Sequence, residues 1–475
     1  MKNTKIYFIL PILLFVGLLI LPLVQEGMFF DGVTYSAISK NMANGFGSFW
    51  NPHYTKVLYS NFHEHPPLVF IIQSFFFRLL GDGFYTERLF CLLIALLTVF
   101  GIVKCWVLLS DNAEMKSYYW LPILFWLLVP LVSWSYKNNL LENTMGVFSI
   151  FSVYFILRAL IESRIVFIFW GAVFIVLAFL SKGFVGVFPI VTPLIFGVVF
   201  QQSKRSLRYL LFLIVLLILI TLCLAKLSPE IVENITKYFE QQLLPALNSK
   251  REITTSNRFK IVFDLILDLS IILIFVFYFV FAEWRGRVGA KFFGNKSFLF
   301  FILVAISASI PIIISLKQRK FYLIPSIPFY ALAFSFLVYQ SAKEGLDRVP
   351  AWGLKWFNRF LCTMLGSIII FSAFRAGMYS RDEAVLKDIY IISTYIPQGT
   401  IIGTTKDLWS DWTLVAYLSR VGYISLDCDN EHEYFLIDKN LGNAVPTHYK
   451  PIDLNLTNYT ILRRSTTSNT PSHGL

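Results

Sequence analysis

The sequence predicts an all-α polytopic membrane protein with a small α/β domain at its C-terminal end. Of its 475 residues, 56% are hydrophobic and 15% are charged, whereas soluble domains average about 25% charged residues. Apolar stretches of the roughly 20 residues that a bilayer crossing requires recur as far as Phe374. The segment Arg381–Leu475 has ordinary charge density and no such stretch.

About eleven transmembrane helices are expected. The first, Ile6–Val24, is too long for a signal-peptide core and lacks a small-residue cleavage site, so we expect a retained span with Lys2 and Lys5 in the cytoplasm. The other predicted spans are Arg88–Leu109, Trp120–Trp134, Met145–Ile161, Ile165–Leu180, Val185–Phe200, Tyr209–Leu224, Ile261–Phe281, Phe298–Ile314, Tyr322–Tyr339 and Phe357–Phe374.

The segment Pro67–Leu80 is predicted to be an interfacial helix. It is short for a span, begins with a double proline and carries Gln73 and Arg78. If it does not cross, most basic clusters that flank spans lie in the cytoplasm, as the positive-inside rule requires, and if it crosses they all lie outside. These clusters are Lys104 to Lys116, Arg158 to Arg164, Lys204-Arg205-Arg208, Arg285-Arg287-Lys291-Lys296 and Lys343 to Arg359.

Two domains follow from this topology. Residues 1–377 form the transmembrane domain, with a first outer loop at 25–87 and a second at 226–260, whose stretch Glu230–Leu247 is amphipathic. Residues 378–475 form a small extracytoplasmic α/β domain. Its expected elements are helices at Asp382–Tyr395 and Asp411–Arg420 and strands at Thr400–Thr404, Tyr423–Leu426 and Tyr434–Ile437, and Ser465–Leu475 is expected to be loose.

Charge and cysteine content exclude two other classes of function. The net charge is +12, but Lys and Arg occur in short clusters between apolar runs, which is typical of loops at an anionic membrane surface and not of nucleic-acid binding. The five cysteines show neither a CxxC motif nor metal-ligand spacing, so we interpret them as small core residues.

The first outer loop carries polar residues that are unusual in so apolar a chain. Asp31 lies just beyond the first span, where it is either a helix cap or a general base whose pKa is raised by an apolar surface. His63, Glu64 and His65 precede Pro66-Pro67, which fix the direction of the backbone. His65 could donate to a phosphate, and His63 and Glu64 could orient a sugar or bind a divalent metal.

Further candidates lie at the predicted outer ends of later spans. Glu142 opens one span and is either a cap or a site residue. Lys182, Lys317 and Lys320 are outward cations that break the charge rule, so they call for an anionic partner, either a lipid headgroup or a bound phosphate. Tyr322 follows the last of these clusters.

These motifs, in this order, resemble the GT-C membrane glycosyltransferases, specifically the protein O-mannosyltransferase and aminoarabinose-transferase group. The resemblance rests on Asp31, on HPPL from His65, on Glu142, on SKG around Lys182, and on a Lys-rich run leading into YLIPSIP. It covers roughly Ile6–Leu337. Two departures stand out: the aminoarabinose branch has Lys where His65 stands, and eukaryotic mannosyltransferases pair Asp with Glu where Gly32 follows Asp31.

The resemblance implies an inverting hexosyl- or pentosyltransferase of the cytoplasmic (inner) membrane, with its active site on the periplasmic side. Such enzymes pass a sugar from a polyprenyl phosphate to a protein, lipid A or glycan acceptor. Asp31 and Glu142 would then be catalytic, and His65, Lys182, Lys317, Lys320 and Tyr322 would bind the donor phosphate. No cofactor follows with certainty, and a divalent metal stays open.

Two alternatives remain. A transporter or flippase for a lipid-linked saccharide would also need many spans, but it should place polar residues near the middle of the bilayer. An O-antigen ligase or polymerase would use arginines in a large outer loop, where Arg251 and Arg258 occur. A non-catalytic scaffold accounts for none of the ordered motifs.

Overall fold

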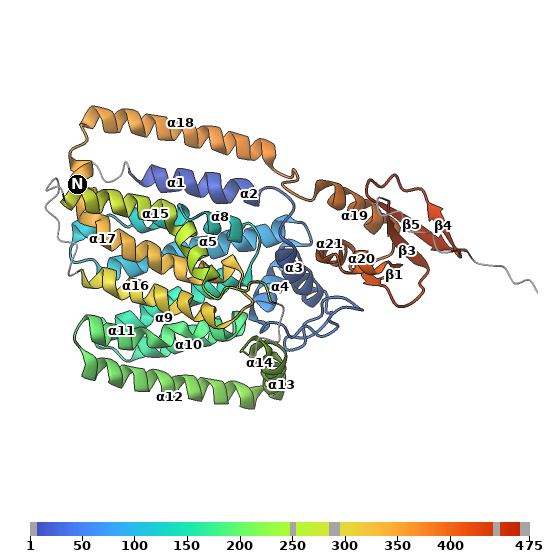
Figure 1. Ribbon diagram of the computed structural model, residues 1–475, viewed down its shortest axis with the longest axis horizontal. Coiled ribbons are helices and arrows are strands. Elements are labelled where there is room, and N and C mark those ends of the chain that lie inside the picture. Colours follow the sequence, from blue (N-terminus) through green and yellow to red (C-terminus); the bar gives the residue numbers. More distant parts are fainter. Residues whose placement is uncertain (1–6, 248–252, 285–294, 440–446, 466–475) are drawn as a thin grey trace, which may run out of the picture.

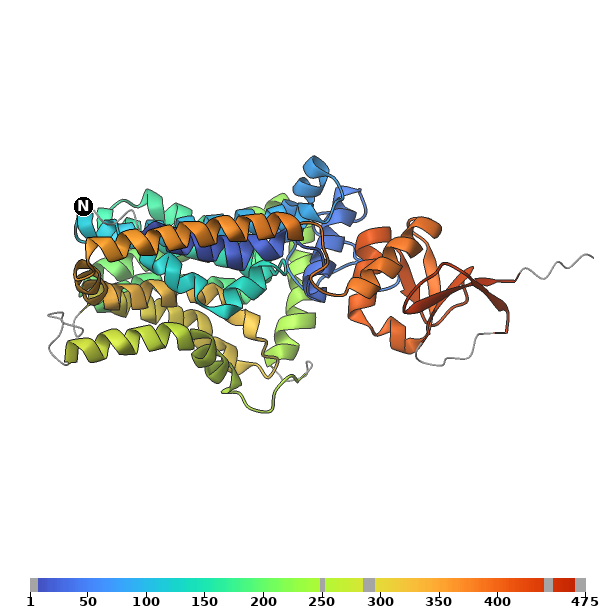
Figure 2. The same ribbon diagram turned by 90° about the horizontal axis from the view of Figure 1, so that it is seen from above.

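The computed structural model describes residues 7–247, 253–284, 295–439 and 447–465. A long helical bundle carries a small domain at one of its ends, and the two views in Figures 1 and 2 agree on this arrangement. Lys2, Lys5, Lys250, Arg251, most of the basic loop at 285–296 and nearly all of the C-terminal tail lie outside the described residues.

Seven helices in the described residues are long and apolar enough to cross a membrane, so the chain is a multi-pass membrane protein. They are α5 (Tyr85–Leu109), α9 (Leu141–Glu162), α12 (Ser203–Leu227), α15 (Lys260–Trp284), α16 (Lys296–Ser309) with η5 (Ile310–Ile314), η6 (Lys320–Ser326) with α17 (Ile327–Asp347), and α18 (Ala351–Arg375).

One bent pair of helices is either a broken eighth span or a re-entrant segment. The segment Ala113–Leu127, which contains α6 (Ala113–Lys116) and α7 (Trp120–Leu127), meets α8 (Pro130–Tyr136) at 80°. The bend follows from Pro130, because a proline disfavours helical backbone in the residue before it and Val129 is extended.

The predicted number of eleven spans is not confirmed. Helices occupy the other predicted places, but they are shorter apolar helices of 10–17 residues. They are the helix Ile9–Leu23, formed by α1 (Ile9–Phe15), η2 (Val16–Ile20) and α2 (Leu21–Leu23), then α10 (Val166–Lys182), and η3 (Phe184–Val191) with α11 (Thr192–Val199).

Helices α12 and α18 lie at the two outer faces of the bundle in Figure 1. Only 6% of the apolar window of α12 and 11% of that of α18 is buried inside the protein. Apolar faces of this extent are unfavourable in water, and they are the surfaces that hydrocarbon would cover.

The end of the bundle next to the small domain collects the short polar-flanked helices. Figure 1 places α3 (Phe30–Ala43), α4 (Leu68–Leu80), α13 (Pro229–Tyr238) and α14 (Leu244–Leu247) there, and η4 (Phe239–Leu243) joins the last two. The amphipathic stretch at 230–247 is therefore helical, as predicted. Its Ile231 packs with Trp50 of the first outer loop and Leu180 of α10.

The C-terminal domain is a five-stranded sheet with helices. Its elements are α19 (Glu383–Tyr395), β1 (Ile401–Thr404), α20 (Lys406–Trp409), α21 (Trp412–Gly422), β2 (Ser425–Asp427), β3 (Tyr434–Asp438), β4 (Tyr449–Ile452) and β5 (Tyr459–Arg464). The strand order is β2-β1-β3-β5-β4, with β1 parallel to β2 and β3, and β5 antiparallel to β3 and β4. The first three predicted strands are confirmed, whereas β4 and β5 were not predicted.

Candidate active site

The start of α3 is held by the junction between α8 and α9. The Phe29 amide donates to Asn138 Oδ1 at 2.8 Å, and Asn139 Nδ2 donates to Ser36 Oγ at 2.9 Å. Asn139 adopts a left-handed backbone conformation (φ 51°), which asparagine tolerates better than most residues. These two asparagines were not among the predicted site residues, although consecutive asparagines between apolar segments are a signal that could identify them.

Gly32 is required by the same contact. A β-carbon on Gly32 would lie 1.9 Å from the carbonyl oxygen of Asn138, well inside any van der Waals contact. Only glycine allows α3 to approach the α8–α9 junction so closely. The absence of a second acidic residue after Asp31 therefore has a steric cause.

Glu142 and Lys182 form a buried ion pair. Glu142 lies in the first turn of α9 and Lys182 in the last turn of the neighbouring α10. Lys182 Nζ is 2.5 Å from Glu142 Oε1, and the two side chains are 7% and 1% exposed. The Lys182 ammonium also lies over the rings of Phe321 and Tyr322, at 5.7 and 5.4 Å from their centroids. Three predicted site residues therefore meet here.

Neither acidic residue is a helix cap. Asp31 and Glu142 are each the second residue of their helix, and the N-cap positions of α3 and α9 are occupied by Phe29 and Leu140. The capping alternative is therefore not observed for either residue.

Asp31 lies close enough to this pair to feel its charges, but it remains partly exposed to solvent. Its side chain forms no hydrogen bond or ion pair with the described part of the chain. Burial raises the pKa of Asp31 to about 6, Lys182 and Arg319 oppose this rise, and Glu142 and Glu64 add to it. Asp31 is thus a carboxylate of raised basicity within reach of Lys182.

The residues before the double proline lie in two different places: His63 contacts α13, and Glu64 and His65 lie closer to α3. His63 is buried, and its Nδ1 lies 3.0 Å from Asn234 Nδ2 of α13, which fits an amide donating to an unprotonated ring nitrogen. Burial lowers the pKa of His63. Its position ties the first outer loop to α13.

The next two residues lie closer to α3. The carboxylate of Glu64 accepts a hydrogen bond from the Tyr59 hydroxyl at 3.0 Å. The His65 ring meets the Tyr35 ring edge-on, with 6.0 Å between centroids. Because Tyr35 lies one helical turn after Asp31, His65 faces the helix that carries the candidate base.

The cations of the lysine-rich run lie in different surroundings. Lys320 Nζ lies 3.9 Å from Asp264 Oδ1 and 3.8 Å from Asp268 Oδ1, so it faces the carboxylates of α15. Lys317 is half-buried, and Arg319 is the residue of this run that, together with Lys182, lowers the pKa of Asp31. Arg319 was not among the predicted site residues.

No metal centre is evident in the described part of the chain, where no three His, Cys, Asp or Glu side chains gather closely enough to hold an ion. His63, Glu64 and His65 are therefore not assembled as a metal site there. The roles of the candidate residues in catalysis and donor binding stay predictions.

One family model matches part of the sequence. Residues 64–228 match the model of dolichyl-phosphate-mannose-protein mannosyltransferase, a segment that contains His65, Glu142 and Lys182. No curated protein sequence matches the chain.

Solved structures match over nearly the whole chain. ArnT from Cupriavidus metallidurans bound to undecaprenyl phosphate is 14% identical, with a TM-score of 0.65 over 98% of this chain and 99% of that one. The apo state of the same protein gives 15% identity and a TM-score of 0.61, over 95% of both chains. AglB, an oligosaccharyltransferase from Archaeoglobus fulgidus, gives 13% identity and a TM-score of 0.52 over 87% of this chain and 63% of that one.

These matches confirm the resemblance that the ordered motifs predicted. Identities of 15% or less establish the architecture and not the sugar or the acceptor. The chain therefore has the fold of the GT-C membrane glycosyltransferases, a helical membrane domain followed by a small C-terminal sheet domain.

Proposed function

We propose that this protein transfers a sugar from a polyprenyl phosphate to an acceptor hydroxyl at the outer face of the cytoplasmic membrane. One observation carries the proposal: the partly exposed Asp31, which has no ion-pair partner among the described residues, lies within the electrostatic reach of a buried Glu142–Lys182 pair. The fold match to a protein bound to undecaprenyl phosphate supports a lipid-linked donor.

The proposed chemistry is a single displacement. Asp31 accepts the proton of the acceptor hydroxyl while the acceptor oxygen forms a bond to the anomeric carbon of the sugar. The bond between that carbon and the phosphate oxygen breaks, and its electron pair leaves with the polyprenyl phosphate. Arg319 and Lys182 lie where positive charge can stabilise the departing phosphate. Displacement from the opposite side inverts the anomeric centre.

A base with a pKa near 6 suits this task. At neutral pH most of the Asp31 carboxylate is ionised, yet it binds a proton more strongly than an ordinary aspartate does. The paired Glu142 is less available, because Lys182 lies 2.5 Å from its carboxylate. We therefore assign the base to Asp31 and the shaping of the local charge to Glu142 and Lys182.

The two alternative functions receive less support. A transporter should carry its polar residues near the middle of the bundle, whereas Asp31 lies on α3 at one end of it. A ligase-like enzyme should present arginines to a diphosphate, but the Arg258 side chain donates to the carbonyl of Ile314. Arg251 lies outside the described residues.

The test combines identification of the product with one substitution. Mass spectrometry of the cell envelope of a deletion strain should show the loss of a hexose or pentose from a defined molecule. Purified protein is then assayed with the lipid-linked sugar fraction of wild-type cells as donor and deletion-strain membranes as acceptor. Asp31→Asn should lower kcat by about 10²–10⁴-fold, the range for loss of a general base. Binding of polyprenyl phosphate should persist.

The matched control is Asp407→Asn, because Asp407 is an exposed aspartate on α20 of the C-terminal domain. It should retain full activity. Near-wild-type turnover by Asp31→Asn would exclude Asp31 as the base.

A further inference from the structure

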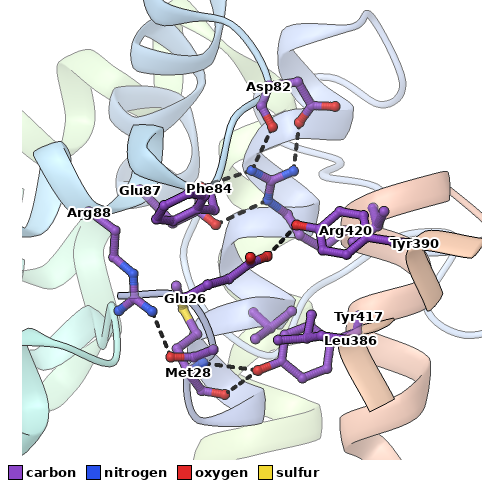
Figure 3. Close-up of a pocket in the computed structure, with 13 residues that line it drawn as sticks. Glu26, Met28, Asp82, Phe84, Glu87, Arg88, Leu386, Tyr390, Tyr417 and Arg420 are labelled. Atoms are coloured by element: carbon purple, nitrogen blue, oxygen red, sulfur yellow. Dashed lines mark hydrogen bonds and ion pairs between the residues drawn. The ribbon is translucent and has the colours of Figure 1, made fainter. Parts of the chain in front are cut away.

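The C-terminal domain packs directly on the helix that carries Asp31. Helix α21 of this domain lies against α3, and a cavity of about 140 Å³ remains between the domain and the first outer loop. Figure 3 shows Arg420 of α21 reaching Asp82 and Glu87 of the transmembrane domain across this cavity. Asp31 does not line the cavity, so the domain contacts α3 away from the candidate base.

A cluster of charges connects the two domains: Lys40, Arg420 and Glu87 are buried, whereas the Asp82 side chain is 55% exposed. Arg420 Nη1 lies 2.6 Å from Asp82 Oδ1, and Arg420 Nη2 lies 2.9 Å from Glu87 Oε2. Lys40 of α3 is 2.7 Å from Asp82 Oδ2 and donates to the Arg420 and Val421 carbonyls at 2.8 and 3.0 Å. These carbonyls belong to the last turn of α21, which lacks partners within its own helix, so Lys40 acts as a C-terminal cap.

The entry to α3 is held from the same side. The Tyr417 hydroxyl accepts a hydrogen bond from the Met28 amide at 2.9 Å. It also lies 3.0 Å from the Met28 carbonyl oxygen and 3.1 Å from Asp382 Oδ2, the two acceptors for its single proton. Met28 is buried and precedes Phe29, whose amide donates a hydrogen bond to Asn138 Oδ1. Two consecutive amides before α3 are therefore fixed by different domains.

The segment before Met28 is also attached to the C-terminal domain. Glu26 forms a β-bridge with Tyr379, with the Glu26 amide donating to the Met378 carbonyl at 2.9 Å. Gly27 has a φ of 91°, and a β-carbon there would lie 2.5 Å from the Arg381 carbonyl oxygen. The chain leading to Asp31 thus runs along the linker between α18 and α19.

We propose that the C-terminal domain sets the position of Asp31, with Tyr417 as a positioning residue that acts through Met28. The inference rests on the proposed role of Asp31 as the base. Transfer requires the carboxylate to meet the acceptor hydroxyl at hydrogen-bond distance, and a displacement of about 1 Å can lower a rate by roughly 10²-fold. A hydrogen bond three residues before Asp31, at the point where α3 begins, controls such a displacement.

The test is Tyr417→Phe, which removes the hydroxyl and keeps the ring. We expect kcat to fall about tenfold, an intermediate loss on the scale of misplacement effects, while KM for the lipid-linked donor stays within twofold. The acidic limb of the pH–rate profile should shift, because the surroundings of Asp31 change. Thermal midpoint, elution volume and polyprenyl phosphate binding report on folding.

The matched control is Tyr423→Phe. Tyr423 belongs to the same domain, and its hydroxyl lies 2.7 Å from His53 Nε2 across the same interface, away from the entry to α3. The control should keep kcat within twofold and leave the pH profile unchanged. Equal losses in the two variants, or an unchanged kcat for Tyr417→Phe, would overturn the inference and reduce the domain to a source of stability.

Asp31→Asn separates the two proposals. If it is inactive while Tyr417→Phe turns over normally, the positioning inference fails and the proposed function stands. If Asp31→Asn is active, Asp31 is not the base, whatever the Tyr417 variant shows.

Discussion

Lys182 and Glu142 form a buried ion pair, and Asp31 is the accessible one of the two predicted catalytic carboxylates. The pair joins the last turn of α10 to the first turn of α9, while Asp31 approaches on a different helix and keeps part of its surface exposed. The proposed function assigns a fixed local charge to the pair and proton exchange to Asp31.

Lys182→Met should destabilise the protein strongly. It leaves the Glu142 carboxylate buried without a counter-charge, a lesion that typically costs about 3–5 kcal/mol. Thermal unfolding in detergent should show a large drop in midpoint, and the double variant Lys182→Met/Glu142→Gln should recover much of it. The exposed pair Lys387–Glu383 is the control, because Lys387→Met should leave the midpoint unchanged. A mild effect of Lys182→Met would mean that the pair is not sealed from water.

Activity should depend on the ionisation of Asp31. A base must be deprotonated, and its pKa is raised to about 6, so kcat/KM should fall as the pH decreases through 6. The slope should approach tenfold per pH unit for a single group. Rates measured between pH 4.5 and 8 test this. A flat profile across pH 6 would argue against a group with this pKa as the base.

Arg319→Gln should move the acidic limb of the pH–rate profile to higher pH. The Arg319 guanidinium lowers the pKa of Asp31, so its removal raises the pH at which half of the activity is lost. A move in the opposite direction would show that Arg319 does not act on the base. Lys320→Gln is the control from the same run of residues, since Lys320 faces Asp264 and Asp268. It should leave the limb in place.

Much of the fold follows from hydrophobic periodicity and charge. Helices occupy every predicted span because long apolar runs have few alternatives in a bilayer. The number of full spans could not be derived, since Val166–Lys182 and its short neighbours are apolar but fall below the length of a straight crossing. Strands β4 and β5 escaped prediction because short strands stabilised by partners distant in sequence give weak local signals.

The sequence allowed the types of residue in the candidate site to be predicted, but it allowed fewer of the contacts between them. The meeting of Glu142, Lys182 and Tyr322 followed from their place at the same ends of spans, which sequence topology indicates. The choice of Arg319 over Lys320 depends on how one irregular turn directs neighbouring side chains, and no local pattern encodes it. The attachment of Tyr417 to Met28 joins residues 389 positions apart, which a single sequence does not reveal.

Asp31→Asn should stabilise the protein at neutral pH while lowering the rate of transfer. The pKa of folded Asp31 is raised from 3.8 to about 6, so ionising it as the pH rises through this window costs folding free energy. Asparagine carries no charge and avoids this cost. The free energy of unfolding should therefore rise by on the order of 1–2 kcal/mol for a partly exposed group. The gain in thermal midpoint should be full above pH 6.5 and should vanish below pH 4. A lower midpoint than wild type at pH 7 would contradict the raised pKa.

Gly32→Ala should be among the most damaging small substitutions in the chain. The new methyl group would lie 1.9 Å from the Asn138 carbonyl oxygen, so α3 must move away from the α8–α9 junction. Overpacking of this kind typically lowers the free energy of unfolding by about 1–3 kcal/mol. Because Asp31 moves with α3, kcat should fall even at temperatures where the variant remains folded. The matched control is Gly366→Ala in α18, where a β-carbon meets nothing within 4 Å. This control should raise helix stability by roughly 0.5–1 kcal/mol and keep full activity. Wild-type turnover by Gly32→Ala would show that the contact between α3 and Asn138 does not position the carboxylate.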